Sequence, residues 1–520
     1  MMAVAASLAL LMQAVAALAP AKPDAGPSHL GLDLPEAAIV EACERAAAQN
    51  VLAAVNAKVF PGYWCVCADG QGFGYGNTYP SLDGHQMADA LLFLRQTETV
   101  RRNWDYVRKF QRPNGALPLA IFPSQAGPDS NGGLYKHWVP GDPLRALAGP
   151  TYIQNADVLF RYTQDRAWLA RELPSVNLAA DYLAALTDAD GGVRGAGYYV
   201  ERPARIEYDG VAQCHAADAF RRVARLNAVA GKKAQALRYN ALADRIARHF
   251  RTAFWRGGRF AEYIHPERGP ITSHGLSDSD WSAIACGIAT RGQTAILWPK
   301  LRAEPGFRYG GMPTGIAAKP ETYEDWEFTT NDRMDLAAMG RVWYVESWAR
   351  ARMGDGDGLL DSIRKVCEVG RAGGYYWRER YTARGPHGAE KYCEYPANLI
   401  RIVERFLLGI EFELDGSVMI APCAPRTYWR LGFGQRLAWR DRALTFRAQG
   451  ERVAGTYSGG SAQRLLISTP ALRTARHAAV TIGKRRIAAT VASGKIAVLL
   501  PAAPADRPVT FVARPTAVSH

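Results

Sequence analysis

The 520-residue sequence lacks long hydrophobic segments and long runs of one charge. After residue 19, no uninterrupted apolar stretch approaches the roughly 20 residues that a membrane-spanning helix needs, so we expect no membrane span. No basic run is longer than the three residues from Lys484 to Arg486. A content of 48% hydrophobic and 22% charged residues excludes a collagen-like or wholly disordered chain. The sequence is that of a globular protein.

The sequence also has few motifs that would bind a metal. Its eight cysteines include one close pair, Cys65 and Cys67, and no C-x-x-C zinc motif. It has no H-E-x-x-H, and the segment Gly354–Gly358 lacks the later glutamate of a calcium loop. We therefore expect no metal and no cofactor. The cysteines are expected to be buried free thiols, with one disulfide as the alternative if the protein is exported.

The basic residues outnumber the acidic ones. Sixty-three Lys and Arg residues against 49 Asp and Glu residues give a net charge of +14. Such an excess favours an anionic partner, for example nucleic acid or an acidic glycan. Because the basic residues are mostly arginines scattered along predicted helices, we predict no nucleic-acid binding. An acidic glycan stays as the anionic partner to consider.

The first residues resemble an export signal. The apolar run that ends at Ala19 has the length of a signal-peptide core, and Ala17-Leu-Ala19 fits the small-x-small cleavage pattern. We predict a signal peptide over residues 1–21, a linker over residues 22–35, and a periplasmic or secreted protein. A buried first helix is the alternative, since no Lys or Arg precedes the run.

From residue 36 to residue 410 the apolar residues recur at helical spacing, in segments that come in pairs. Residues 155–164 pair with 167–186, and residues 211–230 pair with 233–254. A short turn joins the two helices of a pair, and a long loop follows them. We predict a mainly α protein in which six helical hairpins close into an (α/α)6 toroid over residues 36–410.

The pattern changes near Gly409. Residues 410–420, 443–448 and 464–468 alternate between apolar and polar side chains, which is typical of strands with one buried face. We predict a small C-terminal antiparallel β-sandwich domain over residues 411–516. Because all strands follow all helices, the two parts are expected to be separate domains.

The long predicted loops are rich in aromatic, acidic and glycine residues. They comprise residues 64–85, 131–138, 195–210, 321–328 and 373–381. A ring of hairpins would gather these loops at one end of a funnel, and functional groups concentrate on such loops. Flat rings stack on sugar faces, while carboxylates and guanidinium groups bind hydroxyls. The loops therefore favour a carbohydrate site.

Several loop carboxylates are candidates for acid–base chemistry. Glycoside hydrolysis needs a carboxylic acid that protonates the leaving oxygen and a carboxylate on the opposite side. The candidates are Asp83, Glu207, Asp209, Glu379, Glu390 and Glu394. Helix capping is the alternative role for Asp83, Glu207 and Asp209, which lie at the starts of predicted helices. For Glu379 the alternative is an ion pair with the flanking arginines.

The order of these motifs resembles the six-hairpin glycosidases, and most of all the α-L-rhamnosidase group. The similarity lies in a helical region, a late Tyr-Trp-Arg-Glu-Arg loop at residues 376–380, a closing helix, and a β-domain entered through Met419-Ile-Ala-Pro. In that group a late Trp-Glu loop carries the base, so the resemblance implies that Glu379 is the base. Ile206-Glu-Tyr-Asp-Gly resembles the acid region of trehalase- and glucosidase-type members, which implies Asp209 as the acid. The loop of residues 75–85 lies where rhamnosidases keep their acid, which nominates Asp83 instead.

The resemblance implies a glycoside hydrolase that acts with inversion of the anomeric configuration and has a carbohydrate as its partner. The enzyme would be α-L-rhamnosidase-like or a related exo-glycosidase. Burial among Tyr75, Tyr208 and Trp377 would keep the acid protonated. The other expected substrate-binding residues are His85, Trp138, Trp326, Arg378, Glu390 and Glu394. The sugar, its linkage and the oligomeric state stay open.

Two other functions remain as alternatives. A polysaccharide lyase acting on an acidic, uronate-containing glycan would use a Tyr or His as base and an Arg to neutralise the uronate. His85, His137, His215, Tyr208 and Arg205 are the candidates for these roles. A non-catalytic glycan-binding protein would need no acid–base pair at all.

Overall fold

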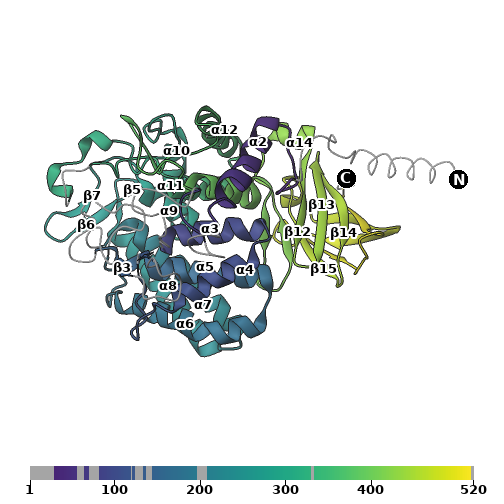
Figure 1. The fold of residues 1–520 in the computed structure, drawn as a ribbon, viewed down its shortest axis with the longest axis horizontal. Coiled ribbons are helices and arrows are strands. Elements are labelled where there is room, and N and C mark those ends of the chain that lie inside the picture. The colour runs from purple at the N-terminus through teal and green to yellow at the C-terminus, as the bar shows by residue number, and fades with distance from the viewer. Residues whose placement is uncertain are drawn as a thin grey trace.

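The computed structural model describes residues 28–55, 64–68, 81–118, 120–122, 133–135, 143–195, 208–328 and 333–516. Helices dominate the part of the chain before residue 408, and strands dominate the part after it (Figure 1). The predicted signal peptide, residues 1–21, lies outside the described residues. Within the described residues, no helix is both long and apolar enough to cross a membrane.

The helical part consists of helices that follow one another in antiparallel pairs. Its helices are α2 (Ala37–Arg45), α3 (Ser81–Phe93), α4 (Thr97–Arg108), α5 (Ala148–Thr163), α6 (Arg166–Ala185), α7 (Gly210–Val229), α8 (Lys233–Ala253), α9 (Asp278–Ala285), α10 (Arg291–Ala303), α11 (Gly340–Met353), α12 (Gly356–Ala372) and α13 (Glu394–Ile402). A π-helical turn extends α2 over Ala46–Val51, and another extends α13 over Val403–Leu407.

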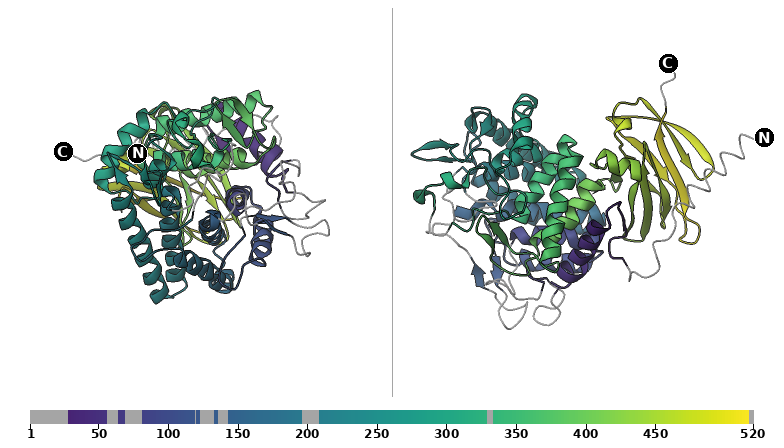
Figure 2. Two further views of the ribbon diagram at one scale, coloured as in Figure 1. Left: turned by 90° about the vertical axis from the view of Figure 1, so that its left-hand side faces the viewer. Right: turned by 90° about the horizontal axis from the view of Figure 1, so that it is seen from above.

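The odd-numbered helices from α3 to α13 form an inner set. Each packs against the next one, and α13 packs against α3, so the six contacts form a closed series. The inner helices are buried on nearly all sides: fourteen of the sixteen residues of α5 are buried. The even-numbered helices are amphipathic, as in α8, whose buried residues Ala236, Tyr239, Ala243, Ile246 and Phe250 share one face. Figure 2 shows the helices surrounding the centre of this part of the molecule.

The strands after residue 408 form two sheets. They are β10 (Ile410–Phe412), β11 (Val418–Ile420), β12 (Phe433–Trp439), β13 (Arg442–Gln449), β14 (Arg452–Ser458), β15 (Gln463–Ile467), β16 (His477–Ile482), β17 (Arg485–Thr490), β18 (Ile496–Leu500) and β19 (Val509–Pro515), with the short helix α14 (Arg426–Leu431) between β11 and β12. One sheet has the order β1-β12-β13-β14-β19-β16-β17 and the other β10-β11-β15-β18. Alternate residues of β13 are buried, as its period-two pattern predicts.

Two details differ from the predicted organisation. Strand β1 (Leu32–Asp33) pairs with β12 through Leu32 opposite Gln435, although residues 22–35 were expected to be a linker. The linker prediction is therefore wrong for these residues, because two residues are too few to show a strand period. Strands β11 and β15 run parallel, so the C-terminal region is not antiparallel throughout.

None of the eight cysteines, all of which lie in the described residues, forms a disulfide bond, and all eight are buried. Burial raises the pKa of several of these thiols, for example that of Cys367 to about 12. The five thiols whose pKa is raised are therefore neutral at physiological pH and contribute packing rather than reactivity; they are Cys43, Cys214, Cys286, Cys367 and Cys423.

Candidate active site

The loops that precede the inner helices gather at the end of the molecule opposite the two large sheets (Figure 1). They carry short hairpins: β2 (Ala120–Phe122), β3 (Gly133–Tyr135), β4 (Trp255–Arg256), β5 (Arg259–Phe260), β6 (Tyr263–His265), β7 (Gly269–Ile271), β8 (Arg380–Thr382) and β9 (Gly385–His387). We call residues 64–68, 208–209, 254–277, 304–328, 333–339 and 373–393 of these loops the rim.

Single β-bridges connect neighbouring rim loops. They pair Asp209 with Tyr263, Ser277 with Ala317, Gly315 with Ala338, Ala338 with Tyr381, and Cys67 with Tyr392. The loops that carry Asp209 and Glu379 therefore belong to one connected structure, at the N-terminal ends of the inner helices.

Asp209 is the residue immediately before α7 and is fully buried. Its Oδ1 accepts a hydrogen bond from the backbone N–H of Val211 at 3.3 Å, so it caps the helix. The next residue, Gly210, donates its N–H to the carbonyl oxygen of Glu262 at 2.8 Å. A Cβ on Gly210 would lie 2.5 Å from Oγ of Ser279, so only glycine lets α7 begin this close to α9.

Tyr208 adopts a left-handed backbone conformation with φ of 49°. Its hydroxyl donates a hydrogen bond of 2.5 Å to Asp188, which raises the pKa of Tyr208. Tyr208 was predicted to lie beside the acid in the sugar site. In the structure its hydroxyl instead binds Asp188, in the loop after α6.

A buried hydrogen-bond network lies beside Asp209, and the sequence did not reveal it. His274 Nδ1 lies 2.7 Å from Glu262 and its Nε2 lies 3.1 Å from Glu327. Tyr323 donates to Glu262, and Tyr263 donates to Glu327. The Tyr323 ring stacks on the His274 ring with 3.6 Å between centroids. The network joins the loop after α8 to the loop after α10 and so fixes two sides of the rim.

This network predicts a pH-dependent stability. Burial opposes the charged imidazole, but the hydrogen bonds with Glu262 and Glu327 outweigh it and raise the pKa of His274 from 6.5 to about 9. The protonated ring therefore stabilises the fold below pH 6.5, and this stabilisation is lost as the pH rises through 9. We expect the free energy of unfolding to fall by about 3 kcal/mol between these pH values because of this group.

Urea unfolding of the wild type and of His274→Gln at several pH values measures this effect. Burial raises the pKa of Glu404 to about 8, so Glu404 titrates in the same pH range in both proteins. The difference between their free energies of unfolding therefore isolates the effect of His274. Identical pH profiles for the two proteins would contradict a charged His274.

Glu379 lies just before β8 and is 2% exposed. Its Oε2 accepts the backbone N–H of Ala389 at 3.2 Å, and its Oε1 lies 3.1 Å from Arg380. Arg380 also lies 3.1 Å from the buried Asp335, so one guanidinium group serves two carboxylates. Gly388 has φ of 80°, and a Cβ there would lie 2.5 Å from Oε2 of Glu379. The local chain is therefore shaped around this carboxylate.

The other late-loop residues have different surroundings. Trp377 is fully buried, and its Nε1 donates to the carbonyl oxygen of Val366 at 3.1 Å. Its ring packs against Gly370 of α12, so it serves the core and has no face open to a sugar. This differs from its predicted role, because the loop turns the ring inward to fill the space that a glycine leaves.

Arg378 and Glu390 form an ion pair at 2.8 Å on the outer side of this loop. Glu394 begins α13 and accepts the backbone N–H of Arg341 at 2.5 Å. Trp326 lies in the loop after α10, where the guanidinium group of Arg268 lies 4.1 Å from its ring centroid. Among the predicted sugar-binding residues Glu390, Glu394 and Trp326, only Glu394 is buried.

His85 lies inside the ring of helices rather than on the rim. It is one turn into α3, where its Nδ1 lies 3.2 Å from Asn155 and its Nε2 lies 3.2 Å from Arg401. Burial, together with the charge of Arg401, lowers its pKa to about 3. Burial likewise lowers the pKa of His215 on α7 to about 3, so both imidazoles are neutral.

Some predicted residues lie beyond what the structure describes. Glu207, Trp138, Tyr75, His137 and Arg205 lie outside the described residues. Asp83 lies in the first turn of α3, and its side chain is not described. Among the described residues no group of three or more His, Cys, Asp or Glu side chains is arranged to hold a metal ion.

Residues 81–297 match the family model described as the bacterial alpha-L-rhamnosidase 6 hairpin glycosidase domain. No curated protein matches the chain. Among solved structures, the α-L-rhamnosidase from Dictyoglumus thermophilum is similar, with a TM-score of 0.60 at 12% identity over 93% of this chain and 50% of that one. The Streptomyces avermitilis α-L-rhamnosidase complexed with L-rhamnose has a TM-score of 0.56 at 13% identity, over 94% of this chain and 42% of that one.

A shorter protein is similar as well. The GH63 mannosylglycerate hydrolase from Thermus thermophilus, in complex with glucose, has a TM-score of 0.51 at 11% identity, over 68% of this chain and 99% of that one. The chain spans half or less of the length of the two rhamnosidases. At these identities the solved structures establish a shared fold. The family match indicates a six-hairpin glycosidase fold over residues 81–297. Residues 81–297 of the chain are thus similar to the six-hairpin glycosidase domain of bacterial α-L-rhamnosidases, and the solved rhamnosidase structures share its fold.

Proposed function

We propose that the protein is a glycoside hydrolase whose active site is the rim. The observation that carries this proposal is the connection of the Asp209 and Glu379 loops at one end of a six-hairpin glycosidase domain. A carbohydrate is the proposed substrate, and an L-rhamnoside is the first candidate, since a similar solved structure holds L-rhamnose.

We also propose the finer architecture and location. The closed series of contacts among inner helices supports an (α/α)6 toroid over residues 36–410, and the two sheets after residue 408 support a β-sandwich. The apolar N-terminal run supports export to the periplasm or the exterior.

The proposed mechanism uses two carboxyl groups. Asp209 donates a proton to the glycosidic oxygen, and Glu379 removes a proton from a water that attacks the anomeric carbon from the other side. The proton on Asp209 passes to the leaving group, and the hydroxyl of the attacking water becomes bonded to the anomeric carbon. After release of the products, Glu379 gives the proton it took up to solvent, and Asp209 takes one from solvent. If roughly 6.5 to 9.5 Å separate the two groups when substrate is bound, inversion follows. Asp83 and Glu207 are the alternative acids.

The surroundings of Glu379 suit a base. Two donors, the N–H of Ala389 and Arg380, fix the orientation of its carboxylate. Glu390 on the same loop is largely exposed and pairs with Arg378 instead. This contrast favours Glu379 over Glu390 in the proposed role.

A screen on nitrophenyl glycosides and on neutral and acidic oligosaccharides tests the proposed activity. We expect new reducing ends without any new near-ultraviolet absorbance. A lyase would instead produce an unsaturated, absorbing product, and a glycan-binding protein would produce neither signal. Either of these outcomes would overturn the proposal.

The assignment of Asp209 as the acid predicts a dependence on the leaving group. Asn still caps α7, so Asp209→Asn should fold. We expect kcat to fall by about 100-fold or more on sugar leaving groups, and by less than about tenfold on dinitrophenyl glycosides, whose leaving group needs no protonation. The matched control is Asp165→Asn, because Asp165 caps α6 in the same way by accepting from Trp168 at 2.9 Å. Equal losses on both kinds of substrate would assign the acid role to another residue.

A further inference from the structure

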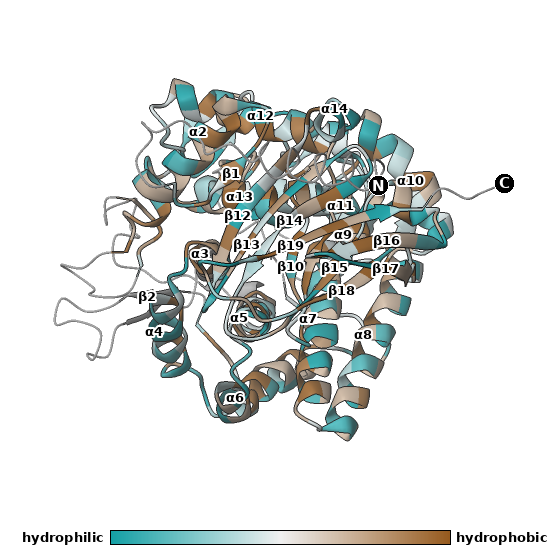
Figure 3. Ribbon diagram, turned by 90° about the vertical axis from the view of Figure 1, so that its right-hand side faces the viewer, coloured by the Kyte–Doolittle hydropathy of each residue, from teal (hydrophilic) through white to brown (hydrophobic). Residues whose placement is uncertain are grey.

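A cavity of about 620 Å³ lies inside the ring of inner helices. It is lined by side chains of α3, α5, α7, α11 and α13, by Cys286 at the end of α9, and by residues of the strand region. Figure 3 views the molecule from the end of the sheets, where β10 crosses the centre of the inner helices. Glu411, Glu413, Met419 and Lys495 close the cavity on that side. We call this space the lumen.

The lumen is distinct from the rim. None of the residues that line the lumen belongs to the rim. The rim lies in the loops before the inner helices, whereas the lumen runs along the helices, from His85, His215 and Arg341 in their first halves to Arg161, Arg225 and Arg352 near their C-terminal ends. The short inner helix α9 explains why there is space here. It ends at Ala285 after 8 residues, whereas its neighbours α7 and α11 have 20 and 14 residues. Arg225 and Arg352 flank this gap and are exposed, so the lumen opens to solvent beside them.

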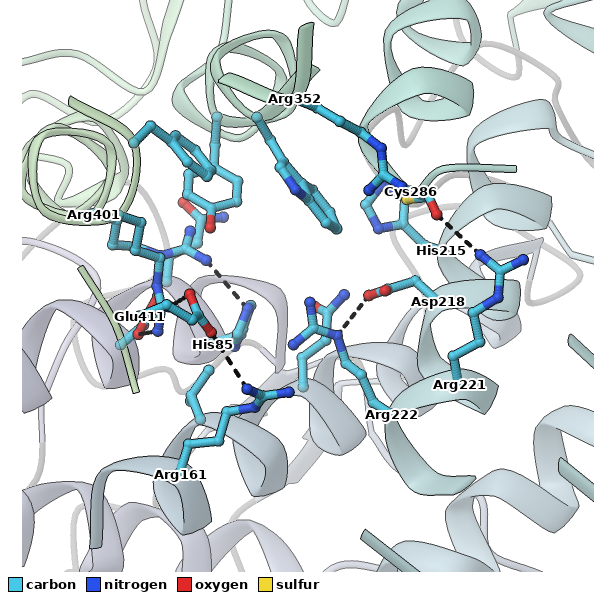
Figure 4. Close-up of a pocket in the computed structure, with 18 of the residues that line it drawn as sticks. His85, Arg161, His215, Asp218, Arg221, Arg222, Cys286, Arg352, Arg401 and Glu411 are labelled. Atoms are coloured by element: carbon cyan, nitrogen blue, oxygen red, sulfur yellow. Dashed lines mark hydrogen bonds and ion pairs between the residues drawn. The ribbon is translucent and has the colours of Figure 1, made fainter. Parts of the chain in front are cut away.

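The wall of the lumen carries far more positive than negative charge (Figure 4). Its nine basic residues are Arg161, Arg221, Arg222, Arg225, Arg341, Arg352, Arg401, Arg405 and Lys495. Its four carboxylates are Asp89, Asp218, Glu411 and Glu413. Two further buried carboxylates behind the wall, Asp157 and Glu394, pair with its arginines. Nine positive charges against six negative ones leave an excess of three among the described residues.

The excess charge is concentrated on one side. Asp89 pairs with Arg401 and Arg405, while Asp157 and Asp218 pair with Arg222. On the side of α9, no described carboxylate lies within ion-pair distance of Arg221, Arg225 or Arg352, and the same holds for Lys495 on the side of the strands. Arg221 instead donates to the carbonyl oxygen of Cys286 at 3.1 Å, and Arg352 to that of Ala285 at 3.5 Å.

The two histidines of the lumen do not add to this charge, because both are neutral. Burial lowers the pKa of Arg225, and Arg222 and Arg161 add to this effect, while the charges of Asp157 and Asp218 oppose it. A partly desolvated cluster of like charges is costly unless an anion neutralises it. Guanidinium groups bind carboxylate and phosphate oxygens through paired N–H donors.

We propose that the lumen is a binding site for a multivalent oxyanion, held between Arg221, Arg225 and Arg352 and closed in by the strand region. Phosphoryl and carboxylate groups share the required chemistry, and the volume admits an anion of the size of citrate or a small phosphate ester. The site adds a ligand to the protein that is independent of the substrate at the rim. Because strands β10 and β11 and Lys495 form its floor, the anion would also tie the helical part to the sheets.

Thermal unfolding of the full chain tests this proposal. Inorganic phosphate and citrate are titrated at constant ionic strength, with sodium chloride as the balancing salt. We expect a saturable rise of Tm by several degrees with at least one of the two anions, since a ligand that binds only the folded state raises its stability. The anion with the lower half-saturating concentration identifies the phosphoryl or the carboxylate class.

The variants locate the effect. In the double variant Arg225→Gln/Arg352→Gln the half-saturating concentration should rise at least about tenfold, because two guanidinium groups without a carboxylate partner are lost. The control is Arg238→Gln/Arg308→Gln, which removes two exposed arginines outside the lumen and should leave it unchanged. A rise of Tm that sodium chloride reproduces, or that survives in the double variant, would overturn the proposal. Since the measurement does not use catalysis, its outcome is independent of the proposed hydrolase activity.

Discussion

Glu379→Gln should lower kcat by about 10²- to 10⁴-fold on any glycoside that the protein hydrolyses, because the variant cannot accept a proton from the attacking water. Gln has nearly the same shape, and its side-chain oxygen still accepts the N–H of Ala389. Arg380 also keeps its ion pair with Asp335, so we expect KM and Tm to change little. Steady-state kinetics on the best substrate of the screen, together with a melting curve, measure these quantities.

The control for this variant is Glu390→Gln in the same loop. Glu390 is largely exposed, and its pair with Arg378 lies on the outer side of the loop, so the rate should stay within about twofold of the wild type. Near-normal turnover of Glu379→Gln, or an equal loss in Glu390→Gln, would eliminate Glu379 as the base.

Asp89→Asn should destabilise the fold by about 3–5 kcal/mol, because it removes the negative member of a buried ion cluster. Asp89 is 2% exposed and lies 2.9 Å from Arg401 and 2.5 Å from Arg405. Although burial alone would raise the pKa of Asp89, the two guanidinium groups lower it well below its usual range. In the variant both arginines keep their charge and lose the carboxylate that both contact.

Denaturant unfolding of the wild type and of Asp89→Asn measures this change. The control is Asp181→Asn, which breaks the exposed pair with Arg238 and should cost less than about 1 kcal/mol. If Asp89→Asn costs no more than Asp181→Asn, the cluster contributes little to the stability of the helix ring.

Local patterns in the sequence predicted the helices well. The expected helices 211–230 and 233–254 correspond to α7 and α8, which differ from them by one residue at the ends. Such helices are long, strongly periodic and bounded by turn residues, so their local signal is sufficient. The change from helical to strand period near Gly409 likewise coincides with the start of β10 at Ile410.

The candidate site was predictable only in part, because its contacts join distant parts of the chain. The late loop directed attention to Glu379, but nothing near His274 in the sequence indicated that it would lie between Glu262 and Glu327. The partners in the lumen are separated even further: Asp89 and Arg401 are 312 residues apart. In the sequence, polar residues at helical spacing indicate a solvent-exposed helix face. Only in the closed ring of helices do these residues lie on the inner side.

The location of the basic residues was likewise not predictable from the sequence. From the sequence, the net charge of +14 favoured an anionic partner, while the scatter of the basic residues along predicted helices argued against nucleic acid. In the structure, nine of the basic residues face one internal cavity. Arginines on α5, α7, α11 and α13 lie together there because each of these inner helices has one face toward the centre of the ring.

The proposed pair of Asp209 and Glu379 would hydrolyse a glycosidic bond with inversion at the anomeric carbon. Proton NMR distinguishes inversion from retention by following the anomeric signal of the first sugar released from the best glycoside of the screen before mutarotation. The proposed roles of Asp209 and Glu379 predict that the anomer opposite in configuration to the substrate appears first. First release of the anomer with the substrate's own configuration, or no hydrolysis of any glycoside tested, would contradict the account.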